Sequence, residues 1–566
     1  MTRIVAPFRP EHVAARPKDA RRQVSPLWTF RVIPYLMALT PVSFTVQLFA
    51  VYSPRWGDVA SCAGAALVFT AAGHVLLKLV LRRSPTTEII LSLLVGLVVL
   101  APFFTVFVPT AYQTLSLIAL CVASMAGVAV TWCTRQQVQR SALPTLIAIV
   151  LVAAIGLQMI STARRVIPDA WRSRRSDARL YTQQRFSTTT NLPATEPLNE
   201  NSLPHIYLIV LDAYGRSDVL QRLYGFDNSV FLEELRGRGF FVARRSRSNY
   251  HLTDLSIAST LNLAYLNGRE LQHFRTRLPL RSMICDSILV RTLKQHGYET
   301  VAFETGKSTT ECESYDRYLS PSKALSDLQD VLIHSTAIPP FLEAVQSWVP
   351  YWPSTLHRNR IAQTFEQLPL VTRGATTPTF VFAHVMAPHP PFVFDELGNA
   401  RNLHGRYLLA DSGPFHAVHD RSSYVDGYRR QLQHVNSQVL RMIDRIQSQA
   451  SRPAVIIIQG DHGPRSAVNV SSPATSDMHE AFGILLAVGA STGASVHASA
   501  FYDEVTPVNI FRQILNSYFG TKLDMLEDRC YFENPIYSYQ FQDVTQAATA
   551  PDAGAGADKS KCFIKN

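Results

Sequence analysis

Hydrophobic and polar residues follow two different length scales along the chain. Before residue 163 the apolar residues form long runs, and after it they form short runs separated by polar segments. Five of the long runs can supply the roughly 20 helical residues that cross a hydrocarbon core. They cover residues 28–52, 59–81, 88–109, 111–133 and 142–162. We therefore predict a transmembrane domain of five helices over residues 27–163.

Basic residues at the ends of these runs predict the orientation of the bundle. The N-terminal tail, residues 1–26, and the connections after the second and fourth runs together hold eleven Lys and Arg residues. The connections on the opposite side hold only Arg55. Because Lys and Arg favour the cytoplasmic side, we expect a cytoplasmic tail and an extracytoplasmic domain after the fifth run. Six arginines between 164 and 179 oppose this count, but long domains cross membranes largely regardless of charge.

The second half of the chain alternates short apolar runs with helical patterns. Continuous apolar runs are typical of buried parallel strands, and they cover residues 206–211, 298–303, 379–385, 454–459 and 482–488. The helical patterns cover about 216–237, 254–266, 286–296, 424–448 and 505–518. This alternation predicts an α/β domain over residues 204–540, with a mostly parallel sheet and helices on both faces. The polar stretch 164–203 is predicted to be a linker, and 541–566 a flexible C-terminal tail.

Composition narrows the class of partner. The 566 residues are 47% hydrophobic and 17% charged, which suits a membrane protein with a large soluble domain. The net charge of +11 is concentrated beside the apolar runs, where anionic lipid headgroups explain it more simply than nucleic acid. The runs themselves hold few ionisable residues, chiefly Arg31, His74 and Lys78, which argues against a transport pathway. We therefore expect a membrane anchor and no nucleic-acid partner.

Four cysteines lie in the predicted external part: Cys285, Cys312, Cys530 and Cys562. Four cysteines allow two disulfides in three pairings, and the sequence does not choose among them. The chain has no Cys-x-x-Cys pair, so a structural zinc knuckle is not expected.

Polar residues follow two of the predicted strands. Asp212 follows the run IYLIVL, and Asp461 and His462 follow AVIIIQ within Gly-Asp-His-Gly. An Asp in such a place often only caps the next helix. Ligands of parallel sheets bind at the carboxyl ends of strands, however, and carboxylate and imidazole ligands together suit a divalent cation. We therefore predict a site for a divalent metal ion at this edge of the sheet.

A third segment, SNYHLTDLSIASTLNLAYL, opens a helix at Thr253. Ordinary capping of that helix by Thr253, with Asp254 in the first turn, is the simpler interpretation of the local pattern. The same geometry also places a hydroxyl at a helix N-terminus, where free amides bind anions. Next to a metal ion, this hydroxyl would become a nucleophile.

The motifs LDAYG, Thr253-x-x-Ser256 and GDHG, in this order and spacing, resemble the sulfatase-like branch of the alkaline phosphatase superfamily. With five preceding spans, the chain is most similar to lipoteichoic acid synthases and phosphoethanolamine transferases. The resemblance implies an alkaline-phosphatase-like fold. It makes Asp212, Thr253, Asp461 and His462 the metal ligands, with Thr253 also the catalytic nucleophile. Substrate-binding roles fall to three further residues: His389, His479 and Ser256.

Other polar residues near the motifs have weaker claims. His384 is expected to lie within a strand as a satisfied core histidine. Arg465 and Lys307 are candidate partners for a substrate anion from position alone, although each is more simply a solvated surface charge.

Two residues depart from the family pattern. The sulfatases proper need a Cys or Ser that matures to formylglycine, followed by an Arg, and Thr253-Asp254-Leu255-Ser256-Ile257 provides neither. A register starting at Ser256 also lacks the Arg. Ala213 stands where many relatives have a second Asp, which argues for a single metal ion.

The resemblance implies transfer of a phosphoryl-linked headgroup, phosphoethanolamine or phosphoglycerol, from a phospholipid donor to an envelope glycan or lipid. The expected location is the bacterial inner membrane, multi-pass, with a periplasmic catalytic domain. Two alternatives stay open. One is a membrane-bound phosphate- or sulfate-ester hydrolase, and the other is a non-catalytic scaffold for envelope assembly.

Overall fold

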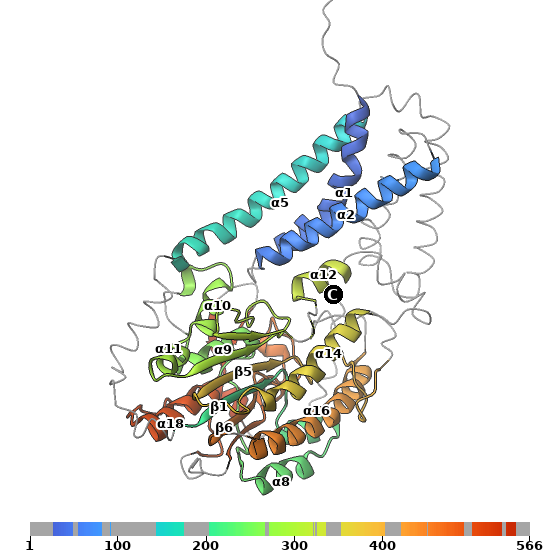
Figure 1. The fold of residues 1–566 in the computed structure, drawn as a ribbon. Coiled ribbons are helices and arrows are strands. Elements are labelled where there is room, and N and C mark those ends of the chain that lie inside the picture. Colours follow the sequence, from blue (N-terminus) through green and yellow to red (C-terminus); the bar gives the residue numbers. More distant parts are fainter. Residues whose placement is uncertain are drawn as a thin grey trace, which may run out of the picture.

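Three long helices adjoin a sheet domain in the structure (Figure 1). This computed structural model describes residues 26–48, 55–81, 91, 95, 143–174, 203–266, 271–320, 322, 325–334, 352–401, 420–449, 451–491, 501–534 and 539–550. The predicted run 111–133 lies outside these residues, as does all of the run 88–109 except Leu91 and Val95.

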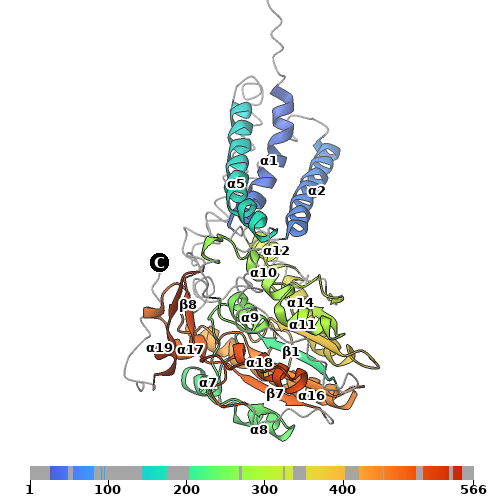
Figure 2. The same cartoon turned by 90° about the vertical axis from the view of Figure 1, so that its left-hand side faces the viewer.

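The long helices correspond to the first, second and fifth predicted runs. They are α1 (Pro26–Leu48), α2 (Trp56–Leu81) and α5 (Leu143–Arg174), and α1 packs beside α5 (Figures 1 and 2). Two stretches of the described residues, Trp56–Val80 and Ile147–Ala170, are long and apolar enough to cross a membrane. The predicted bundle of five helices is therefore not shown, and the structure supports two candidate spans in its place. Pro34 and Pro41 interrupt the backbone hydrogen bonding of α1.

Helix α5 continues beyond the predicted end of the fifth run. Its last turns occupy residues that the polar composition predicts to be linker. There the buried carboxylate of Asp169 accepts a hydrogen bond from the backbone N–H of Arg275 at 2.8 Å, in the sheet domain. The helix is thus attached to the sheet domain.

The sheet has seven strands, and the prediction of a mostly parallel α/β sheet is confirmed. In spatial order the strands are β2 (Phe241–Val242), β7 (Leu486–Ala490), β6 (Ala454–Gly460), β1 (His205–Leu211), β5 (Thr379–Val385), β3 (Glu299–Phe303) and β4 (Arg317–Leu319). In this sheet β7 runs in the opposite direction to the other six strands. The run 482–488 was expected to be a parallel strand. Its first residue instead ends the short helix α17 (Met478–Phe482), and the strand starts later.

Helices cover both faces of the sheet because neighbouring residues of a strand point in opposite directions. Ile206, Leu208 and Val210 of β1 pack on one face, whose helices are α9 (Thr253–Asn262), α10 (Leu278–Cys285), α11 (Ile288–Gln295) and α18 (Pro507–Phe519). The opposite face carries α7 (Ser217–Tyr224), α8 (Ser229–Gly237), α14 (Trp352–Gln367) and α16 (Arg421–Gln449). The helix predicted over 216–237 is divided at Gly225, whose φ of 57° ends α7.

Three smaller elements complete the described fold. Helix α12 (Asp327–His334) lies next to the membrane helices (Figure 1). A two-stranded antiparallel sheet pairs β8 (Tyr531–Glu533) with β9 (Phe541–Asp543), and α19 (Thr545–Thr549) follows it. Thus β9 and α19 fold within the stretch 541–566 that is predicted to be a tail. Val544 and Ala548 explain this, because they bury their side chains against Phe482 and Phe532.

One disulfide joins Cys285, the last residue of α10, to Cys312 in the loop between β3 and β4. Cys530 is buried and free, and Cys562 lies outside the described residues. The structure therefore selects one pair from the pairings that the sequence leaves open. The bond closes a stretch of chain with a sequence separation of 27.

Removing this disulfide is expected to destabilise the sheet domain. The chain-entropy contribution of a loop of this size is about 3 kcal/mol, so the double variant Cys285→Ser/Cys312→Ser should unfold at a lower temperature than the parent. Thermal unfolding of the detergent-purified protein measures the shift. Dithiothreitol should lower the Tm of the parent and leave that of the variant unchanged. An equal shift in both proteins would contradict the assignment.

Candidate functional site

Three predicted site residues meet at the carboxyl edge of the sheet. Asp212 directly follows β1, and Asp461 and His462 follow β6. The two strands are neighbours, and their register places Leu211 opposite Gly460. All three side chains are buried. The strand order therefore brings together side chains that lie far apart in the sequence.

The imidazole of His462 is the point on which the other groups converge. Its Nε2 lies 3.5 Å from Asp212 Oδ1, 3.5 Å from Asp461 Oδ2 and 3.3 Å from Thr253 Oγ1. Its Nδ1 lies 2.8 Å from the carbonyl oxygen of Gly463. A carbonyl only accepts hydrogen bonds, so Nδ1 carries the proton and Nε2 keeps its lone pair. That lone pair faces the two carboxylates and the threonine hydroxyl.

Each carboxylate has one oxygen without a partner. Asp212 Oδ2 lies 3.2 Å from His384 Nε2, and Asp461 Oδ1 accepts the backbone N–H of Ala213 at 3.0 Å. The other two oxygens, Asp212 Oδ1 and Asp461 Oδ2, are buried and have no hydrogen-bond donor within the described residues. Such groups are costly unless a cation compensates them. The donor set therefore fits a divalent metal ion.

His384 belongs to this group, although the sequence analysis set it apart as a core histidine. It does lie within β5 and is buried, as expected. Its ring contacts Asp212, and ligand atoms of Asp212, His384 and Asp461 all lie within 4.8 Å of one another. The sequence feature that could have identified His384 is its position one residue before the end of β5, a strand that pairs with β1.

The protonation states of Asp212 and His462 suit metal binding. Burial, the largest influence, raises the pKa of Asp212. The nearby charge of His389 and the hydrogen bond from His384 outweigh it and hold this pKa well below its ordinary value. Burial and the charge of Arg465 lower the pKa of His462. At neutral pH, Asp212 is therefore ionised and His462 is neutral, the forms in which both bind metals.

Thr253 does not cap its helix. The N-cap residue is Leu252, and Thr253 is the first residue of α9, with no side-chain capping bond. The expected N-cap position is therefore wrong by one residue. Because the Thr253 hydroxyl does not cap the helix, it points at His462. One turn later, Ser256 Oγ is buried without a hydrogen-bond partner among the described residues.

A buried ion-pair cluster supports the start of α9. Arg277 forms a hydrogen-bonded ion pair with Glu533, and its Nε lies 3.6 Å from Asp254 Oδ2. The side chains of all three residues are almost fully buried. Because Asp254 follows Thr253, this cluster holds the backbone that presents the threonine. No local pattern predicts this cluster, since Glu533 lies 256 residues from Arg277.

Two tight turns shape the edge of the sheet. A Cβ atom on Gly460 would lie 2.5 Å from the carbonyl oxygen of Tyr214, and one on Gly463 would overlap the carbonyl oxygen of Glu480. Ala213 has a φ of 62°, a conformation that costs energy for a residue with a side chain. The backbone N–H that this conformation directs at Asp461 is part of the site.

The remaining predicted residues lie at different distances from this centre. The backbone N–H of His389 donates to the carbonyl oxygen of Asp212 at 3.0 Å. Arg465 donates to His462 Nε2 at 3.1 Å and to the carbonyl oxygen of His251 at 2.9 Å. His479 lies half-buried on α17, in the segment that follows His462. Lys307 lies in the loop after β3. The roles of these four residues stay predictions.

Loss of one carboxylate should abolish tight metal binding. The Asp461→Asn variant keeps the shape of the side chain but loses the charge. Its affinity for Zn²⁺ should fall by more than about 100-fold, which is the largest loss usual when only a hydrogen-bond partner of a metal ligand is changed. Competition titration against a chelator measures this. Asp426→Asn, an exposed carboxylate on α16, is the control. Equal metal affinity in Asp461→Asn and the parent would refute the site.

Breaking the cluster beneath α9 should destabilise the fold. Arg277→Met leaves Asp254 and Glu533 buried without their cation, which costs about 3 to 5 kcal/mol. The Tm should fall clearly, as measured by thermal unfolding. Arg430→Met removes an arginine whose pairs with Asp426 and Glu396 are exposed, and it should change the Tm little. Similar shifts in the two variants would argue against a supporting role for Arg277.

Solved structures that resemble the chain include bacterial transferase domains. The C-terminal periplasmic domain of EptC from Escherichia coli, in complex with Zn, matches with a TM-score of 0.42 and 12% identity, over 64% of this chain and 97% of that one. The integral membrane lipooligosaccharide phosphoethanolamine transferase A from Neisseria meningitidis matches with a TM-score of 0.37 and 13% identity, over 86% and 94%. Likenesses at this level do not identify a substrate.

Sequence comparison gives the family directly. No curated protein matches the chain. The Sulfatase family matches residues 204–504, more than half of the 566 residues, and this range contains Asp212, Thr253, Asp461 and His462. The chain therefore belongs to the sulfatase family of the alkaline phosphatase superfamily of enzymes.

Proposed function

We propose that the protein transfers a phosphoryl-linked headgroup from a phospholipid to an envelope glycan or lipid, with Thr253 as nucleophile. The headgroup is of the phosphoethanolamine or phosphoglycerol type. One observation carries the proposal. The uncapped hydroxyl of Thr253 lies 3.3 Å from His462 Nε2, at the point that two unpaired carboxylate oxygens also face. A hydroxyl in this setting is suited to attack and a poor candidate for a structural role.

Asp212, Asp461, His462 and Thr253 would hold one divalent metal ion, zinc or manganese. The mixture of carboxylate, imidazole and hydroxyl ligands is compatible with either ion. Such an ion favours the ionised form of a neighbouring hydroxyl and offsets negative charge on phosphoryl oxygens. His384 stands beside Asp212 and would fix the orientation of that carboxylate.

The residues of the chain would perform a two-step transfer. The hydroxyl of Thr253 loses its proton to solvent, and its oxygen attacks phosphorus and forms a new P–O bond, while the bond from phosphorus to the lipid oxygen breaks. The departing diacylglycerol oxygen takes up a proton. A hydroxyl of the acceptor then attacks the phosphothreonine, loses its own proton and restores Thr253. Free backbone amides at the start of α9 and the guanidinium of Arg465 would stabilise charge on the phosphoryl oxygens.

The substrate-side residues would act on the oxygens that enter and leave. His389 is buried beside Asp212, and His479 belongs to the segment after His462. Both would bind the leaving or entering oxygen. Ser256 Oγ, unpaired one turn from Thr253, would donate a hydrogen bond to the headgroup phosphate.

The membrane helices give this chemistry a location. Two candidate spans would keep the domain at the surface where a phospholipid donor lies. The Cys285–Cys312 disulfide supports an extracytoplasmic position, since disulfides persist in oxidising compartments. We therefore place the protein in the bacterial inner membrane with its catalytic domain in the periplasm.

A threonine at the nucleophile position argues against a formylglycine sulfatase, which needs Cys or Ser there. A hydrolase would use the same four residues with water as acceptor. A scaffold without activity would have no use for two buried carboxylate oxygens that have no hydrogen-bond donor among the described residues. Identification of the reaction products separates these alternatives.

The covalent intermediate provides the test. After incubation with Zn²⁺ and vesicles of phosphatidylethanolamine and phosphatidylglycerol, intact mass spectrometry should show a headgroup phosphate added to the parent protein. Thr253→Ala should show no adduct and should lose turnover by about 1000-fold or more. Ser256→Ala should keep the adduct. An adduct that persists in Thr253→Ala would sink the nucleophile assignment, and free headgroup as the sole product would indicate a hydrolase.

A further inference from the structure

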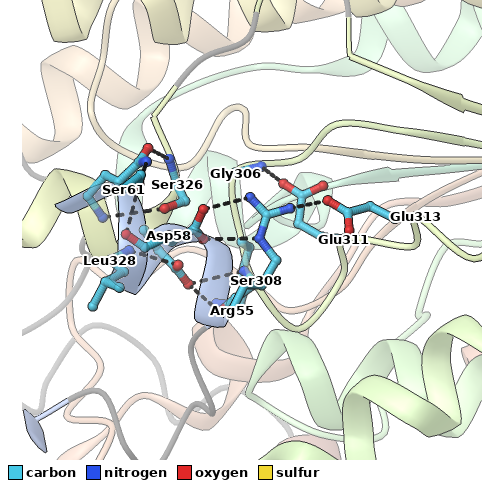
Figure 3. Close-up of polar contacts among 12 residues, drawn as sticks. Arg55, Asp58, Ser61, Gly306, Ser308, Glu311, Glu313, Ser326 and Leu328 are labelled. Carbon is cyan, nitrogen blue, oxygen red and sulfur yellow. Dashed lines mark hydrogen bonds and ion pairs between the residues drawn. The ribbon is translucent and has the colours of Figure 1, made fainter. Parts of the chain in front are cut away.

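One continuous segment connects the site to the membrane helices. Residues 304–334 leave the carboxyl end of β3, form β4 and end in α12, and the structure describes all of them except 321, 323 and 324. We call them the docking segment. Figure 3 shows the segment beside Arg55, Asp58 and Ser61 at the start of α2, with Arg55 between Asp58 and Glu313.

At one end, the docking segment contacts the site through Thr310. The Oγ1 of Thr310 lies 3.1 Å from Nδ1 of His384, whose Nε2 lies 3.2 Å from Asp212 Oδ2. Thr310 is itself held, because its Oγ1 lies 2.9 Å from that of Thr305 and its N–H donates to the carbonyl oxygen of Lys307 at 2.9 Å. A carboxylate only accepts hydrogen bonds, so Nε2 of His384 donates to Asp212, and Nδ1 faces the hydroxyl of Thr310, which helps to fix the orientation of the ring.

The middle of the segment is a rigid turn built on Glu311. Its Oε1 accepts the backbone N–H groups of Thr305 at 3.2 Å and Gly306 at 2.6 Å, and its other oxygen accepts the hydroxyl of Tyr318. This carboxylate is buried, and burial raises its pKa. A displacement at one end of the turn must therefore move Thr310.

Helix α12 is joined to the same turn. Asp327, its first residue, accepts the backbone N–H of Ser308 at 3.1 Å and the hydroxyl of Ser308 at 2.9 Å. The N–H of Asp327 donates to the carbonyl oxygen of Gly306 at 2.8 Å. The loop and the helix consequently form one unit.

At the other end, this unit is attached to α1 and α2. Arg55 makes two hydrogen bonds to Asp58, at 3.0 and 3.1 Å, and a third to Glu313 Oε1 at 2.6 Å. Gln329 on α12 donates to Ser61 Oγ at 3.0 Å. Apolar contact completes the junction, since Leu332 packs against the cluster of Val42, Val46 and Cys62.

Arg55 holds the junction in one geometry. Its side chain is only 22% exposed, and the bidentate contact with Asp58 fixes its fork toward Glu313. Glu313 follows Cys312, whose disulfide ties the same turn to α10. Arg55 thus contacts a turn that is also held by a covalent bond, at the residue next to Glu313.

We propose that Arg55 is a positioning residue of the catalytic site: through Glu313 and the docking segment, α2 sets the position of Thr310 and thereby the orientation of His384 beside Asp212. The inference rests on the proposed function in taking Asp212 as a metal ligand. An interface that only anchors the domain would leave the metal site unaffected, and this difference makes the proposal testable.

The first measurement is Zn²⁺ affinity of the full chain in detergent, by competition with a chelator. Thr310→Val removes the partner of His384 directly and should weaken binding about 10-fold. Arg55→Gln should weaken Zn²⁺ binding severalfold. Arg55→Lys should weaken it less, because lysine keeps the positive charge but not the planar guanidinium that makes two parallel hydrogen bonds. Arg430→Gln removes an arginine from an exposed ion-pair group on α16 and is the matched control, with unchanged affinity. Unchanged affinity in Arg55→Gln would overturn the proposal.

The second measurement needs no metal. Hydrogen–deuterium exchange of metal-free protein should be faster over residues 304–316 and 382–389 in Arg55→Gln, and unchanged there in Arg430→Gln. If the parent binds no Zn²⁺, the metal site of the proposed function fails, and exchange alone decides. Faster exchange around His384 would then support the coupling, and unchanged exchange in that region would overturn it.

Discussion

The site depends on two carboxylates that are buried side by side at the ends of adjacent central strands. Burying ionised groups is unfavourable unless they are paired, and Asp212 and Asp461 each keep one oxygen unpaired within the described structure. Such an arrangement persists only where the surroundings leave the side chains no alternative. Here the two core clusters immobilise β1 and β6 from both faces, so neither carboxylate can turn toward water.

The backbone around these carboxylates is equally constrained. The glycines on either side of Asp461 and His462 allow close approach to neighbouring carbonyl groups, and Ala213 adopts a left-handed conformation that delivers an N–H to Asp461. Arg277 stabilises the start of α9 through its ion pairs with Asp254 and Glu533. The fold therefore places several energetically unfavourable features close together. Binding of a cation would offset the largest of them, the buried negative charge of the two carboxylates.

The strand-end residues were predictable because their signal is local. A continuous apolar run followed by Asp, or by Gly-Asp-His-Gly, identifies a buried strand and the residue at its end, and the adjacency of β1 and β6 then brings the side chains together. The predicted start of α9 is wrong by one residue, since Thr253 is a favoured N-cap residue by type and the observed N-cap, Leu252, is not. His384 was set aside because a strand that is buried on both faces shows no alternation to reveal which side chains face the site.

Other features depend on contacts between distant parts of the sequence. Arg277 and Glu533 pair across more than two hundred residues, as do Arg55 and Glu313, and no local pattern relates either pair. Helix α17 occupies the first residue of the predicted run and delays the start of β7. The antiparallel direction of β7 is seen in its pairing with β6 and β2, which no local pattern reveals. The predicted bundle of five helices rests partly on residues outside the described structure. Among the described residues, the long apolar runs give two candidate spans.

The junction between α2 and the docking segment bears on how a membrane-anchored enzyme of this kind would be organised. A flexible tether would suffice to keep a domain near its lipid donor, and it would need no specific polar contacts. The observed junction has a bidentate arginine, an amide-to-hydroxyl hydrogen bond and an apolar contact, and it leads within one segment to the partner of His384. Contacts of this number are expected if the membrane helices also determine the geometry of the site. The anchor and the catalytic centre would then function as one unit.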